Sequence, residues 1–148
     1  MAVCHRRFGK TLMIIHCLIE CQHRNPQGSF IAPTYQQAER NAFEYLKEAT
    51  KVFPGVKYNA AKLRCEIPNP QVGKITIFLL SGSSESSEQI RGMYMDALVL
   101  DEYQDLPPKV FPQIVRPALA DRRGKCLWIG NPRAIMPSRQ SMTRGLPK

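Results

Sequence analysis

The chain has 148 residues, of which 43% are hydrophobic, so its length and composition fit one globular domain with one core. Its longest apolar run, from Ile75 to Leu80, is far too short to cross a bilayer, and no basic segment leads into an apolar stretch after Met1. We therefore expect a cytoplasmic protein without a membrane anchor. The formal charge of +9, from 21 basic and 12 acidic residues, favours polyanionic partners such as nucleic acid or nucleotides.

The five cysteines are an odd number without paired spacing, which argues against a disulfide framework. His16, Cys17, Cys21 and His23 lie close together and suggest a zinc site. We favour a structural role, because cysteines four residues apart on an apolar helix behave as small hydrophobic residues. No second cluster with metal-ligand spacing is visible in the sequence either.

Hydrophobic periodicity and turn residues predict an alternation of helices and strands. In the first half, the predicted elements are a helix from residue 11 to about 21 that is apolar nearly all round, a strand over 29–32 and an amphipathic helix over 35–50. In the second half, they are a hairpin of strands 63–67 and 75–80, a polar loop over 81–87, a strand over 97–100, a helix over 110–119 and a strand over 126–129.

This alternation predicts an α/β fold whose mainly parallel sheet is flanked by helices. We expect one domain over residues 1–132 and an unstructured basic tail over residues 133–148, where no periodicity is visible. In such folds, ligands bind beyond the carboxyl ends of the strands. The residues that could bind ligands or take part in chemistry fall at those ends.

Residues 4–11 (CHRRFGKT) match the phosphate-binding P-loop pattern, except that Cys4 occupies the position of the first glycine. Gly9 would let the backbone approach a phosphate closely, and backbone N–H groups at the helix start would contact its oxygens. Lys10 would bring a cation to the β- and γ-phosphates, and Thr11 would offer a hydroxyl to Mg²⁺. Alone, a short motif of this kind often arises by chance.

The strand Ala97–Leu100 delivers two adjacent carboxylates, Asp101 and Glu102, to the end of the sheet. One carboxylate can hold the Mg²⁺ shell while the other orients and activates water against the γ-phosphate. The order and combination of the two motifs predict a P-loop NTPase that uses ATP and Mg²⁺.

The arginines of the P-loop indicate which family of P-loop NTPases the sequence resembles. The run RRFGKT over residues 6–11 resembles the variant P-loop of tailed-phage terminase large subunits, which often carry arginine where other ATPases have glycine. Further segments that resemble this family are 31–38, 89–92, 101–108 and 115–122. The resemblance covers about residues 4–132 and implies a P-loop ATPase of the additional-strand catalytic glutamate type.

The resemblance implies a role for each matching residue. Lys10 would contact the β- and γ-phosphates, and Thr11 would bind Mg²⁺ together with Asp101. Glu102 would be the catalytic carboxylate. The complete ATP-binding segment is Arg6, Arg7, Phe8, Gly9, Lys10 and Thr11. Arg6 would contact the γ-phosphate from within the same subunit. For Arg7, two other roles stay open: a solvated surface charge or a contact with DNA.

Two further motifs carry implied roles. Arg91 would reach into the active site of a neighbouring subunit, or else form a structural ion pair with Asp96 or Glu88. Gly130, Asn131 and Pro132 stand where the family has the motif that couples hydrolysis to movement. That motif usually has serine or threonine before the proline, but asparagine can also hydrogen-bond a phosphate or water. Tyr103 and Gln104 are expected to support the loop without chemistry.

The implied function is ATP hydrolysis that drives double-stranded DNA into a phage procapsid in the host cytoplasm. The implied partners are DNA, the portal, the small terminase subunit and further copies of the chain. We do not find the strand that normally precedes a P-loop, nor the nuclease domain of that family. We therefore expect a truncated fragment, and whether this fragment is active by itself stays open. Nuclease cleavage is not expected.

Two alternatives stay open. Residues 101–105 (DEYQD) also resemble the carboxylate motif of superfamily-one DNA helicases, although these have a glycine-rich P-loop without arginine. The chain can also be a non-enzymatic prophage remnant that binds DNA or phage proteins by charge alone. Nucleotide binding separates the remnant from the two enzymes, and DNA unwinding separates the helicase from the packaging motor.

Overall fold

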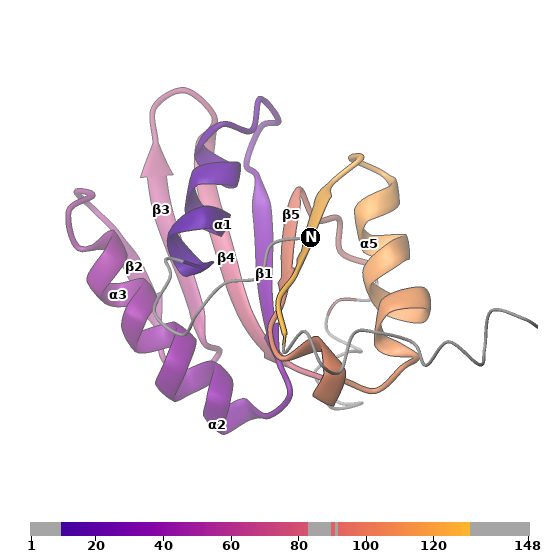
Figure 1. The fold of residues 1–148 in the computed structure, drawn as a ribbon. Helices are drawn as coiled ribbons and strands as arrows, with labels where there is room; N and C mark the ends of the chain where they lie inside the picture. Colours follow the sequence, from indigo (N-terminus) through magenta and orange to yellow (C-terminus); the bar gives the residue numbers. More distant parts are fainter. Residues whose placement is uncertain (1–9, 83–89, 91, 131–148) are drawn as a thin grey trace, which may run out of the picture.

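The structure is a computed structural model that describes residues 10–82, 90 and 92–130 (Figure 1). The described residues form one six-stranded sheet with the order β2-β3-β4-β1-β5-β6. The strands are β1 (Gln27–Ala32), β2 (Lys57–Asn59), β3 (Arg64–Asn69), β4 (Gly73–Ser81), β5 (Ala97–Leu100) and β6 (Lys125–Trp128).

The sheet is mixed but mostly parallel. Strand β1 pairs in parallel with both β4 and β5, and β5 pairs in parallel with β6. Strands β2 and β3 pair antiparallel, and β3 forms the predicted hairpin with β4. The α/β fold expected from the alternation of elements is therefore confirmed.

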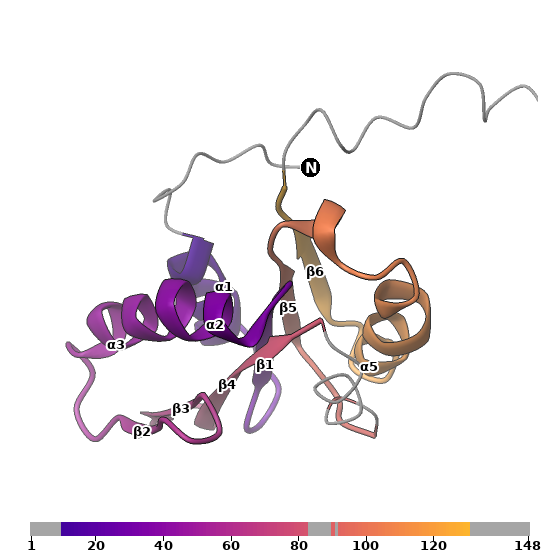
Figure 2. The ribbon, with the colours of Figure 1, turned by 90° about the horizontal axis from the view of Figure 1, so that it is seen from below.

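Helices cover both faces of the sheet (Figure 2). On one face lie α1 (Lys10–Ile19) and a long helical segment composed of α2 (Tyr35–Gln37), a π-helix (Ala38–Phe43) and α3 (Glu44–Thr50). On the other face lies a π-helix (Phe111–Val115) that continues into α5 (Arg116–Ala120). No helix within these described segments is long and apolar enough to span a bilayer.

The alternation of side chains along the central strands creates two cores. Phe30 and Ala32 of β1 face the core beneath α1 and α3, whereas Ile31 between them faces the core beneath α5. All four residues of β5 are buried, which matches a central parallel strand covered on both sides.

The long helical segment begins at a capping box. The Thr34 hydroxyl accepts a hydrogen bond from the Gln37 backbone N–H, and the Gln37 side chain accepts one from the Thr34 backbone N–H. This reciprocal pair satisfies N–H groups that have no partner within the helix. It fixes the point at which the chain leaves β1 and turns back along the sheet.

Several sequence-based boundaries need correction. The first helix ends at Ile19 rather than near Cys21, and it is not buried all round, because Leu12 is 48% exposed and Ile19 is 37% exposed. A helix that packs one face on a sheet leaves its opposite face in solvent whatever the residue type. The short strand β2 was not predicted, and the proposed tail over 133–148 lies outside the described residues.

Candidate functional site

The carboxyl ends of the parallel strands and the beginning of α1 share one edge of the sheet (Figure 1). Helix α1 runs back along the sheet toward the start of β1, so its first turn, with Lys10 and Thr11, lies at the edge where β1 and β5 end. The first turn of a ten-residue helix has N–H groups without a partner inside the helix, and it carries the positive end of the helix dipole. This edge is therefore suited to an anionic ligand.

Asp101 and Glu102 lie at the same edge, immediately after β5. The Asp101 backbone N–H donates a 2.8 Å hydrogen bond to the Ile31 carbonyl, which extends the ladder between β5 and β1 by one residue. Both acidic residues are partly buried. The start of α1 and the carboxylate pair thus lie at the same edge of the sheet.

Glu102 adopts an unusual backbone conformation. Its φ of 46° and ψ of 50° lie in the left-handed region, which non-glycine residues rarely occupy. The conformation breaks the strand and opens a single 3₁₀ turn over Tyr103–Asp105, closed by a 2.8 Å hydrogen bond from the Asp105 N–H to the Glu102 carbonyl. Strain of this kind at a strand end is common at functional sites.

The Gln104 side chain holds the Glu102 carboxylate. Its amide nitrogen donates a 2.7 Å hydrogen bond to Glu102 Oε2 and a longer one, of 3.3 Å, to Asp105 Oδ2. The sequence analysis gave Gln104 only a supporting role in the loop, because the left-handed turn that folds Gln104 back onto Glu102 leaves no signal in the sequence.

Strand β6 ends against the same turn. The Tyr103 N–H donates a 3.0 Å hydrogen bond to the Ile129 carbonyl, and a Cβ atom placed on Gly130 would lie only 2.3 Å from Gln104 Oε1. A side chain at position 130 would therefore have to displace the end of the Gln104 side chain. The first residue of the predicted coupling motif contacts the residue that holds Glu102, while Asn131 and Pro132 lie outside the described residues.

Aromatic packing supports this junction. The rings of Tyr103 and Trp128 stack with centroids 5.4 Å apart, and Phe111 contacts Trp128 edge-to-face at 4.9 Å. The three rings connect the turn after β5, the end of β6 and the helix on the second face. Such pairs contribute about 0.5–1.5 kcal/mol beyond the area that they bury.

The remaining predicted site residues lie outside the part of the chain that the structure describes. They are Arg6, Arg7, Phe8, Gly9 and Arg91. The position of α1 is known, but the side chains of Lys10 and Thr11 are not described. The suggested ion pair between Arg91 and Asp96 likewise stays untested, although Asp96 already contacts Arg122 at 3.2 Å.

Comparison with known proteins identifies similar chains. No protein-family model matches the sequence. The terminase large subunits of Thermus virus P23-45 and Thermus phage G20c are each 27% identical over 122 residues. This alignment covers 74% of the present chain but only 25% of either relative, so the chain corresponds to a quarter of their length.

Solved structures agree with the sequence comparison. The large terminase ATPase domain of Thermus phage P74-26 superposes with a TM-score of 0.65 and 27% identity, covering 86% of this chain and 57% of that domain. The large terminase of another thermophilic bacteriophage, in complex with ADP, shares the fold, with a TM-score of 0.66 at 22% identity over 85% of this chain and 32% of that protein. The resemblance that the motifs indicated, to the ATPase domain of phage terminase large subunits, is therefore confirmed over most of the chain.

Proposed function

We propose that this chain binds ATP with Mg²⁺ at the carboxyl edge of its sheet and hydrolyses it, as the ATPase part of a phage DNA-packaging motor. One observation carries the proposal. The Asp101–Glu102 pair follows β5 at the edge where α1 begins with Lys10 and Thr11, in a chain similar to terminase ATPase domains. This combination supplies a phosphate cradle and a catalytic carboxylate on one rigid sheet.

The residues at this edge fit Mg²⁺. The ion prefers oxygen ligands and commonly binds through one or two protein side chains. A carboxylate from Asp101 and a hydroxyl from Thr11 are ligands of this kind, and both residues belong to elements that meet at the edge. When bound, the ion neutralises charge on the phosphate oxygens.

Glu102 is proposed to orient and deprotonate the attacking water. Its carboxylate is already restrained, since Gln104 donates to Oε2 and leaves Oε1 for another partner. A restrained carboxylate lowers the entropic cost of placing the water in line with the γ-phosphate. Gln104 acts through Glu102, so we assign it as a positioning residue.

The P-loop residues complete the proposed site. Lys10 would pair with the β- and γ-phosphates, and residues 6–9 would contribute further contacts to them, with Arg6 acting on the γ-phosphate. Arg91 is proposed to act on the site of a neighbouring copy, which implies a homo-oligomer. Gly130, Asn131 and Pro132 would transmit the state of the site, and the contact between Gly130 and Gln104 supports this.

Double-stranded DNA is the proposed polymer that the motor moves. The net charge of +9 supports a polyanionic partner, and the similar proteins are terminase large subunits. A portal and a small terminase subunit are proposed as protein partners from the same similarity.

The test measures ATP hydrolysis by the purified chain with and without double-stranded DNA, together with DNA unwinding. The packaging function predicts Mg²⁺-dependent hydrolysis without strand separation. Unwinding of duplex DNA would instead support a helicase. Absence of both nucleotide binding and hydrolysis in a folded chain would support a remnant and overturn the proposal.

A further inference from the structure

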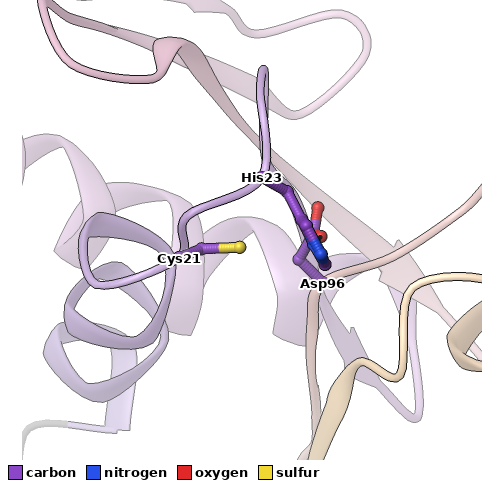
Figure 3. A group of neighbouring side chains, drawn as sticks. All are labelled: Cys21, His23 and Asp96. Atoms are coloured by element: carbon purple, nitrogen blue, oxygen red, sulfur yellow. Dashed lines mark hydrogen bonds and ion pairs between the residues drawn. The ribbon is translucent and has the colours of Figure 1, made fainter.

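A second group of metal-ligating side chains lies at the opposite edge of the sheet. Cys21 and His23 belong to the loop between α1 and β1, and Asp96 immediately precedes β5 (Figure 3). One potential ligand atom from each residue lies within 4.8 Å of the other two. In the sequence, Cys21 and His23 lie close to His16 and Cys17. In the fold, the third member of their group is instead the carboxylate of Asp96, which is 73 residues away from His23.

Asp96 is the buried member of this group. Its side chain is 2% exposed, and a buried carboxylate is costly unless its oxygens are satisfied. One oxygen, Oδ2, accepts a 2.8 Å hydrogen bond from the Gln27 backbone N–H and a 3.2 Å hydrogen bond from Arg122 Nη1. The other oxygen, Oδ1, lies 2.5 Å from His23 Nδ1.

This division of roles is typical of a metal-binding carboxylate. Ligating carboxylates are usually held on one oxygen by hydrogen bonds from the protein while the other oxygen binds the ion. Gln27 and Arg122 provide that support here. The Arg122 guanidinium is itself held 3.5 Å over the Tyr94 ring, so the supporting cation is also positioned by packing.

We propose that Cys21, His23 and Asp96 bind Zn²⁺. Thiolate, imidazole and carboxylate are the ligands that zinc takes in proteins, and three protein ligands leave a fourth position for water. The thiolate and the carboxylate together neutralise the charge of the ion. The site is independent of the ATPase proposal, because it lies at the other edge of the sheet.

Binding requires the side chains of Cys21 and His23 to adjust, because the three ligand atoms lie within 4.8 Å of one another rather than at tetrahedral spacing. Tetrahedral ligands about 2.0–2.3 Å from zinc lie roughly 3.4 Å apart, so His23 Nδ1 must move about 1 Å from Asp96 Oδ1. His23 is 49% exposed and lies in a loop, so it can move, whereas the buried Asp96 stays fixed. The bound ion would connect the α1–β1 loop to the start of β5.

The first experiment measures Zn²⁺ binding to the purified chain by competition with a chromophoric chelator. We expect one tight site, at least about tenfold weaker in Cys21→Ser and in His23→Gln. Both variants keep the contacts of Asp96 with Gln27 and Arg122, so they should remain folded. Cys17→Ser and His16→Gln are matched controls from the preceding helix α1, and they should bind as the wild type does.

Thermal unfolding provides a second measurement. Zn²⁺ should raise the midpoint of the wild type and of both controls, and raise that of Cys21→Ser clearly less at the same Zn²⁺ concentration. Co²⁺ should give the absorption of a tetrahedral thiolate complex in the wild type and in Cys17→Ser. The same absorption should be missing in Cys21→Ser. Equal Zn²⁺ affinity in the wild type and Cys21→Ser, loss of binding in Cys17→Ser, or no tight binding at all would overturn the proposal. The last result would leave His23 and Asp96 as a simple hydrogen-bonded pair.

Discussion

Replacement of Gly130 by alanine tests whether the residue that follows β6 controls the proposed catalytic carboxylate, Glu102. The new Cβ atom would lie 2.3 Å from Gln104 Oε1, whereas carbon and oxygen atoms make contact at about 3.3 Å. The Gln104 amide must therefore retreat by roughly 1 Å. If the amide retreats away from Glu102, its 2.7 Å hydrogen bond to Glu102 Oε2 lengthens beyond hydrogen-bonding range, which is the outcome that we predict.

The size of the effect follows from that one hydrogen bond. A hydrogen bond to a charged group contributes about 1.5–3 kcal/mol, and each 1.36 kcal/mol corresponds to about a tenfold change in rate. Gly130→Ala should therefore lower kcat by about 10- to 100-fold. The Kd for ATP should change less than about twofold, because neither Gly130 nor Gln104 is proposed to contact the nucleotide.

The assay combines steady-state ATP hydrolysis with equilibrium nucleotide binding. Gln104→Ala removes the amide group with which the new methyl group would collide. In a protein that carries Gln104→Ala, the further change Gly130→Ala should therefore not lower kcat any more. Gln104→Glu is matched in size but replaces the donor by a second negative charge, so it should be as slow as Gln104→Ala or slower. A folded Gly130→Ala protein with wild-type kcat, or additive effects in the double variant, would refute the coupling.

Three further predictions concern other residues. Glu102→Gln should keep ATP affinity and Mg²⁺ dependence while turnover falls by orders of magnitude; retained turnover would remove Glu102 from catalysis. Arg91→Ala should spare nucleotide binding but stop hydrolysis, and mixing it with Glu102→Gln subunits should restore some activity if Arg91 acts between subunits. No recovery in a co-assembled mixture would give Arg91 a structural role or a role within its own subunit. Burial raises the pKa of Glu66, but the hydrogen bond from Lys74 and the charge of Arg64 lower it more, so its pKa lies below the ordinary value. Its ion pairs therefore stabilise the fold above about pH 4.3, and this contribution is lost as the pH falls through the lower folded pKa. Glu66→Gln should lower the free energy of unfolding by up to about 1 kcal/mol at pH 7 and match the wild type in acid; equal values at pH 7 would contradict this.

The central strands were predictable because their signals are local. Ala97–Leu100 is an apolar run that ends in two carboxylates, and the turn residues before Gly73 mark the hairpin. Both signals survive in the fold because burial of an apolar strand and the geometry of a turn depend on neighbouring residues. Asp101 follows the parallel strand β5, and α1 runs back along the sheet, so the start of α1 and Asp101 come to one edge.

Other features depend on contacts between distant segments. The strand β2 (Lys57–Asn59) is exposed at all three residues and carries no apolar signal, so only its pairing with β3 reveals it. Gly28 lies within β1, where a Cβ atom would lie 2.5 Å from Leu18 Cδ1 of α1, and this approach between distant segments is not visible in the sequence. The contacts of Gln104 and Asp96 likewise arise from backbone turns that residue patterns do not encode.

The most direct test of the central claim is the binding and hydrolysis of ATP with Mg²⁺ by the wild type, Lys10→Ala and Lys57→Ala. Lys10 begins α1 at the carboxyl edge of the sheet, whereas Lys57 lies on the exposed edge strand β2. The account predicts that Lys10→Ala binds ATP at least about tenfold more weakly and hydrolyses none, while Lys57→Ala behaves as the wild type. Equal binding and turnover in all three proteins would contradict the assignment of this edge as an ATPase site.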